Sequence, residues 1–153
     1  MTFSIGTTAF KPGGSIPRAF TADGKDASPA LSWVNTPSGT RAFALICDDP
    51  DAPVGTWVHW VIWNVPASAK GLPEGVQTIK TLADGSAQGK NDFGRIGYGG
   101  PSPPPGKPHR YFFRLYALKE KLSLAAGATR RELEKAMQGK ILGSAELFGT
   151  YGR

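Results

Sequence analysis

The chain of 153 residues contains only two histidines, and each stands at the start of an aromatic, strand-like run. His59 lies in the segment Trp57–Trp60, and Tyr111 follows His109 by two positions. Imidazole exchanges protons near neutral pH and donates hydrogen bonds to anions, and a phenol adds another donor. An acidic turn that begins at Asp49 precedes the His59 run. If the strands are neighbours, these four side chains converge on one patch.

Each of these residues also has a purely structural interpretation. A single histidine in an aromatic strand is commonly a partly buried, hydrogen-bonded residue. Asp-Pro-Asp is common in turns, because aspartate accepts backbone N–H bonds and proline fixes φ. The two histidines beside aromatic residues and a proline-rich segment nevertheless favour a shared site. Asp49 would repel an anion, so it could orient a histidine, hold a proton or contact an ammonium group.

Motifs that define other kinds of site are absent. The chain has no G-x-S-x-G elbow, P-loop, H-E-x-x-H or C-x-x-C motif. Two histidines and an aspartate could bind zinc, but histidines fifty residues apart are a weak metal signal. The single cysteine, Cys47, lies in an apolar run with no histidine near it, which indicates a small buried hydrophobic residue. We therefore expect no metal and no cofactor.

The elements that must position these residues are mostly short strands. Apolar, β-branched and aromatic residues predict strands at 30–34, 42–47, 57–65 and 111–118. One helix is predicted, because Thr129 and Glu132 form a capping box. Apolar residues then follow at helical spacing as far as Ile141, and Gly143 could end the helix. The pattern predicts a mainly β, antiparallel, Greek-key, sandwich-like fold with a short C-terminal helix.

A long glycine- and proline-rich connection, whose core is residues 97–106, lies between the two strongest strands. This composition is incompatible with a helix and poorly suited to a sheet. Phe93 and Tyr98 at its ends favour an ordered loop packed against the body of the protein. Long ordered loops in compact domains are commonly functional.

Composition and charge indicate one globular domain, residues 1–153, with 40% hydrophobic and 20% charged residues. The net charge of +6 arises in residues 101–153, which carry ten basic and four acidic side chains. This excess is compatible with an anionic partner but is more typical of a mixed, solvated surface. No nucleic-acid-binding motif accompanies it, so we expect no nucleic acid. No signal peptide or membrane span is recognisable, which predicts a cytoplasmic location.

Three longer segments carry a resemblance to a known family. They are residues 16–33, with Phe-Thr-Ala-Asp-Gly at 20–24; residues 49–60, which begin Asp-Pro-Asp-Ala-Pro; and residues 97–118, which end Leu-Tyr-Ala-Leu. Together they resemble the phosphatidylethanolamine-binding proteins, most closely their prokaryotic Raf-kinase-inhibitor-like branch. The resemblance covers nearly the whole chain, and chance agreement over all three segments is implausible.

The resemblance implies that family's fold and a small anion pocket at the protein surface. By position, the wall of the pocket would consist of Asp49, Pro53, Trp57, His59, Gly100, Pro103, His109 and Tyr111. The implied ligand is phosphate or a phosphoethanolamine head group, and the implied regulatory partner is a protein kinase or phosphoprotein. The resemblance and the aromatic-rich composition also suggest a homodimer.

Two positions depart from the family pattern. Ser102 stands where many relatives carry cysteine, and Lys107-Pro108 precedes His109 unusually. Neither removes an expected donor. We therefore predict a non-enzymatic anion-binding module. The alternative is a hydrolase or phosphoryl-transfer enzyme with His59 or His109 as base, although no nucleophile with an adjacent base is evident. A third possibility is a dimerisation module that uses the aromatic strands as its interface.

Overall fold

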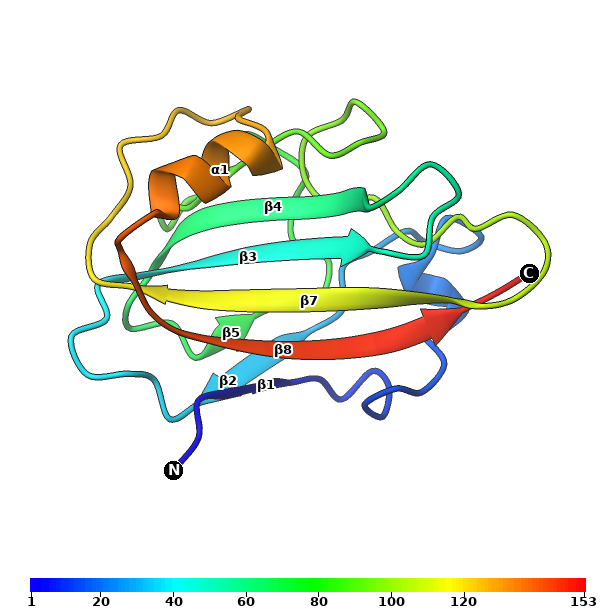
Figure 1. The fold of residues 1–153 in the computed structure, drawn as a ribbon, viewed down its shortest axis with the longest axis horizontal. Helices are drawn as coiled ribbons and strands as arrows, with labels where there is room; N and C mark the ends of the chain where they lie inside the picture. Colours follow the sequence, from blue (N-terminus) through cyan, green and yellow to red (C-terminus); the bar gives the residue numbers. More distant parts are fainter.

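Two antiparallel β-sheets form the structure, a computed structural model that describes residues 1–153 (Figure 1). The larger sheet has the strand order β6-β4-β3-β7-β8, and the smaller sheet has the order β1-β2-β5. The strands are β1 (Ser4–Gly6), β2 (Leu31–Val34), β3 (Ala42–Asp49), β4 (Trp57–Pro66), β5 (Gly71–Leu72), β6 (Ala87–Gln88), β7 (His109–Leu118) and β8 (Ile141–Tyr151). The helices are a 3-10 turn, η1 (Arg18–Phe20), and α1 (Arg130–Met137). The predicted mainly antiparallel β fold with one short helix is confirmed.

Strand β3 lies at the centre of the larger sheet, between β4 and β7. All eight of its residues are buried, because both faces of the sheet are covered at this point. A strand buried on both faces has a continuous apolar sequence rather than an alternating one. Most of β7 instead alternates between buried and more exposed residues, and its buried set faces the smaller sheet.

A cluster of buried side chains lies on each face of the larger sheet. Between the sheets, Trp33 of β2 packs on Phe43 of β3, with ring centroids 5.1 Å apart. On the opposite face, Leu133 and Met137 of α1 belong to the second cluster. Cys47 is buried in the first cluster, as its apolar surroundings in the sequence predict. The sandwich is thus closed on one side by a sheet and on the other by a helix.

The capping box at the start of α1 is confirmed. The side chain of Thr129 accepts the backbone N–H of Glu132, and the Glu132 carboxylate accepts the backbone N–H of Thr129. The expected length of the helix is wrong. Gly139, with φ of 76°, turns the chain after the helix, so Ile141 and Gly143 belong to strand β8. No helix of the structure is long and apolar enough to cross a membrane.

Strand β8 is missing from the sequence-based expectation, as are the short strands β1, β5 and β6, yet β8 pairs with the whole length of β7. Small residues interrupt its apolar pattern, so pairing with β7, more than its own composition, makes it a strand. Part of its outer edge is covered by residues 13–16, which form backbone hydrogen bonds with Phe148 and Thr150. This cover leaves less free edge for unwanted pairing.

Antiparallel pairing places the end of β3 beside the beginnings of β4 and β7. Asp49, the last residue of β3, lies opposite Trp57, and Asp48 lies opposite Phe112. The end of β3 and the starts of β4 and β7 meet at the right-hand end of the larger sheet in Figure 1. Residues as much as sixty positions apart in the sequence therefore meet at one end of one sheet.

Replacing Gly149 of β8 with alanine should destabilise the protein. A Cβ atom there would lie 2.7 Å from the side chains of both Ile16 and Phe10, so these residues would have to shift. We expect the free energy of unfolding, measured in urea, to fall by about 1–3 kcal/mol. The control is Gly6→Ala in β1, where a Cβ meets nothing within 4 Å. Equal stability of the two variants would contradict the packing of the N-terminal segment on β8.

Candidate functional site

A cavity of about 230 Å³, termed here the histidine pocket, opens at this end of the larger sheet. Tyr111 contacts both histidines, with ring centroids 5.2 Å from His59 and 6.5 Å from His109. The pocket brings together seven of the eight residues assigned from the sequence: Asp49, Pro53, Trp57, His59, Pro103, His109 and Tyr111. The rest of the wall consists of Ala52, Val54, Phe93, Ser102 and Pro104.

A β-bulge in β4 directs His59 into the pocket. Residues 47 and 48 of β3 pair with Trp60 and Val58, so His59 between them is an extra residue in β4. Strict alternation would place His59 on the same face as Val61, beneath α1. The bulge instead brings the imidazole to Tyr111, on the face toward the smaller sheet. Bulges commonly redirect side chains beside functional sites.

His59 presents a hydrogen-bond acceptor to the pocket. Its Nδ1 lies 2.6 Å from the carbonyl oxygen of Gly99, and because a carbonyl only accepts, Nδ1 carries the proton. Burial lowers the pKa of His59, and the hydrogen bond to Gly99 and the charges of Asp49, Asp92 and Asp26 offset this only in part. In the neutral ring, Nε2 therefore offers a lone pair.

His109 is oriented by Asp49. The Nδ1 of His109 donates to Oδ2 of Asp49 at 2.7 Å, and Oδ1 of Asp49 accepts the backbone N–H of Asp51 at 2.8 Å. Both carboxylate oxygens are engaged, so the geometry supports orientation of a histidine rather than contact with an ammonium group. The Nε2 of His109 is an acceptor in the neutral ring and a donor in the protonated ring.

Two residues of the pocket wall each carry a buried donor that has no hydrogen-bond partner in the protein. These donors are the hydroxyl of Tyr111 and the indole N–H of Trp57. Burial, followed by the charge of Asp49, raises the pKa of Tyr111 above its ordinary value, so the hydroxyl stays protonated. A buried donor without a partner costs about 1–3 kcal/mol. Such donors are typical of sites where a ligand supplies the acceptors.

Gly100, the eighth assigned residue, does not line the pocket but lies behind its wall. Its N–H donates to Oδ1 of Asp26 at 2.6 Å, and a Cβ would come within 2.6 Å of that oxygen and of the Phe20 carbonyl oxygen. Only glycine fits this close approach. The adjacent Gly99 bonds to His59 through both its N–H and its carbonyl. This loop thus supports the pocket from behind, which agrees with the prediction that it is ordered and packed against the body of the protein.

Phe93 is a wall residue that the sequence indicates only as an aromatic residue near the glycine- and proline-rich loop. Its ring meets those of Trp57 and His59 edge-on, at centroid distances of 5.5 and 5.4 Å. The side chain of Asn91 fixes the position of Phe93, because the Asn91 amide accepts the backbone N–H of Phe93 and donates to the Gly97 carbonyl. The sequence signal that could have identified Phe93 as a pocket residue is an aromatic side chain in a turn beside a glycine-rich loop.

The proline side of the pocket is held by the C-terminal residue. Arg153 donates to the carbonyl oxygen of Pro103 at 3.0 Å and to the hydroxyl of Ser102 at 3.3 Å. Arg153 is itself anchored by Asp23, and hydrogen bonds from Arg153 and Tyr151 lower the pKa of Asp23 to about 2. No local sequence pattern links residues so far apart, so this support is visible only in the structure.

The fold and the pocket together define a β-sandwich ligand-binding domain. No cluster of three or more histidine, cysteine, aspartate or glutamate side chains suited to a metal ion is formed. The pocket combines apolar and aromatic walls with a few convergent polar groups, the usual composition of a small-molecule site.

Comparison with known proteins identifies the family. The family model described as phosphatidylethanolamine-binding protein matches residues 6–152. A UPF0098 protein of Methanothermobacter thermautotrophicus is 51% identical over 150 residues, which are 98% of this chain and 99% of that protein. A UPF0098 protein of Aquifex aeolicus is 49% identical over 95% of this chain and 85% of its own length. The chain belongs to the phosphatidylethanolamine-binding protein family, as the resemblance implied.

Solved structures agree with this assignment. Escherichia coli YbcL, described as a new member of the mammalian family, superposes with a TM-score of 0.93 at 33% identity and covers 100% of this chain and 99% of its own. A homologue from Chlamydia trachomatis superposes with a TM-score of 0.90 at 37% identity, over 99% of this chain and 98% of its own.

The imidazole of His59 should titrate below its ordinary pKa of about 6.5. NMR measures this midpoint directly, and His59→Gln assigns the two histidine signals. Because the unfolded chain binds this proton more readily than the folded protein, His59 should lower stability as pH falls below about 6.5. A midpoint at or above the ordinary value would contradict the acceptor assigned to Nε2.

Proposed function

We propose that the histidine pocket binds a small oxyanion, and that phosphate and phosphomonoesters are its ligand class. The observation that carries this proposal is the pair of unpartnered donors, Tyr111 and Trp57, in one pocket. Oxyanion oxygens accept several hydrogen bonds at once and would satisfy both donors. The cavity of about 230 Å³ has the volume of roughly eight water molecules, which suits a phosphate-sized group rather than a whole lipid.

The acceptor at His59 adds a requirement for a proton on the ligand. Nε2 of the neutral ring would repel a fully deprotonated oxygen, whereas a P–OH group donates to it. A ligand that both accepts from Tyr111 and donates to His59 matches the pocket. Phosphate keeps a proton near neutral pH, whereas sulfate does not.

The family name suggests where a phosphate group occurs. A phosphoethanolamine head group and a protein kinase or phosphoprotein both carry one, and we propose these as the forms that the protein meets. A phosphomonoester keeps the proton that His59 would accept mainly below its second pKa of about 6. The homodimer and the cytoplasmic location stay predictions. Membership of the family supports general ligand binding.

A hydrolase or phosphoryl-transfer enzyme is less well supported. Such an enzyme needs a nucleophile beside a base. The hydroxyl of Ser102 bonds to Arg153 rather than to a histidine, and the raised pKa of Tyr111 keeps its hydroxyl protonated. We therefore propose binding without turnover, and assays with a panel of phosphoesters test this directly.

Tyr111→Phe should weaken phosphate binding about tenfold without loss of stability. The variant removes a donor to the ligand and also removes a buried polar group that has no partner in the free protein. Calorimetry with inorganic phosphate measures the affinity, and urea denaturation without phosphate measures stability. The matched control is Tyr116→Phe on the opposite face of β7, which should bind as the wild type does. Unchanged affinity in Tyr111→Phe would argue against the proposed function.

Phosphate should bind at least about tenfold more tightly than sulfate at about pH 8. Both ions are then dianions of similar shape, but only hydrogen phosphate retains a proton to donate to His59. Competition calorimetry compares the two ions in the same buffer. Equal affinities would show that His59 does not act as an acceptor, even if the oxyanion site itself is correct.

A further inference from the structure

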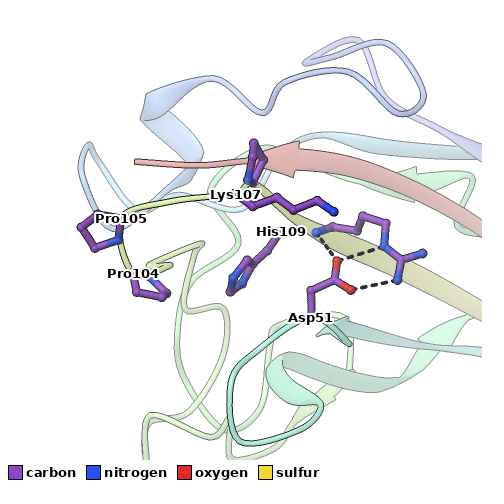
Figure 2. Close-up of a pocket in the computed structure, with 7 residues that line it drawn as sticks. Asp51, Pro104, Pro105, Lys107 and His109 are labelled. Carbon is purple, nitrogen blue, oxygen red and sulfur yellow. Dashed lines mark hydrogen bonds and ion pairs between the residues drawn. The ribbon is translucent and has the colours of Figure 1, made fainter.

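A second cavity of about 490 Å³, termed here the basic groove, adjoins the histidine pocket. The two cavities share His109 and Pro104. The groove is lined by Asp51, Pro104, Pro105, Lys107, Pro108, His109 and Arg110. In Figure 2, the imidazole of His109 lies between the prolines and Asp51. A ligand bound at His109 in the histidine pocket could therefore extend directly into the groove.

The groove has an excess of positive charge. Arg110 donates from Nε and Nη2 to the carboxylate of Asp51, both at 2.9 Å, so these two charges compensate each other. Arg110 retains three further N–H donors. Lys107 forms no ion pair, which leaves one positive charge without a partner. The uncompensated charge and the free donors favour an anion.

The groove is also preorganised. Arg110 is held from two sides, by Asp51 and by the ring of Phe112, whose centroid lies 5.4 Å from the guanidinium carbon. The hydrogen bonds from Arg110 lower the pKa of Asp51 to about 2, so this pair stays charged at neutral pH. The three prolines fix their own φ angles. Groups held in place before binding lose little conformational freedom when a ligand arrives.

We propose that the basic groove binds a second anionic group of the ligand whose phosphate occupies the histidine pocket. This inference rests on the proposed function. A carboxylate or second phosphate a few bonds from the first phosphate would meet Lys107 and the free donors of Arg110. An ammonium group in the same position would face the unpaired charge of Lys107. The groove thus favours a doubly anionic ligand over the phosphoethanolamine head group that the family name suggests.

Three probes with the same phosphate test the groove: 2-phosphoglycolate, 2-hydroxyethyl phosphate and phosphoethanolamine. Their second groups are a carboxylate, a hydroxyl and an ammonium. In calorimetry at about pH 6 and low salt, we expect affinity to fall in that order, with about fivefold between carboxylate and hydroxyl. Lys107→Met should remove most of that difference, because it weakens binding of the carboxylate probe more than binding of the hydroxyl probe. Lys107→Glu should reverse the difference, so that the hydroxyl probe binds more tightly than the carboxylate probe.

The control is Lys121→Met, which removes the same charge beyond the far end of β7 and should preserve the order of affinities. Equal affinity for the carboxylate and hydroxyl probes in the wild type would overturn the groove proposal alone. An equal loss for all three probes in Lys107→Met would do the same. Failure of all three probes to bind the wild type would overturn the proposed function and the groove together.

Discussion

The antiparallel pairing of β3 with both of its neighbours is the constraint on which the pocket depends. It places Asp49 at the end of one strand beside Trp57 and Tyr111 near the starts of two others. Since β3 is buried on both faces, this register cannot slip without exposing apolar side chains. The large core therefore fixes the relative positions of a few polar atoms at one edge.

Tyr111 shows how the core and the pocket are combined. Its ring belongs to the cluster between the sheets, whereas its hydroxyl has no partner in the protein. Burial of a tyrosine ring removes roughly 150–250 Å² from water, which at about 25 cal/mol per Å² contributes about 4–6 kcal/mol. The unpartnered hydroxyl costs about 1–3 kcal/mol. The free energy gained by burying the ring therefore exceeds the cost of leaving the hydroxyl without a partner.

The sequence predicts strands β2, β3, β4 and β7 because their signals are local, but it does not predict the short strands β1, β5 and β6 or the long strand β8. Apolar runs identify β3, β4 and β7, and the residues alone suggest that Asp49, His59, His109 and Tyr111 converge. The resemblance to the family adds the other three wall residues, Pro53, Trp57 and Pro103. Three features depend instead on pairing between distant segments. The bulge at His59 follows from the register with β3, β8 forms because β7 offers an edge, and Arg153 reaches Pro103 from the far end of the chain. No window of neighbouring residues contains that information.

The two histidines differ in role because their Nδ1 atoms have different partners. Burial favours the neutral ring of His59 by lowering its pKa, and the Gly99 carbonyl keeps the proton on Nδ1, so one side of the pocket keeps a fixed lone pair on Nε2. The carboxylate of Asp49 accepts from His109 in either protonation state, so Nε2 of His109 is free to follow the ligand. His109 is also the histidine that the pocket shares with the basic groove. In the proposed binding mode, the adaptable side of the pocket therefore faces the part of the ligand that varies, and the fixed side faces the phosphate.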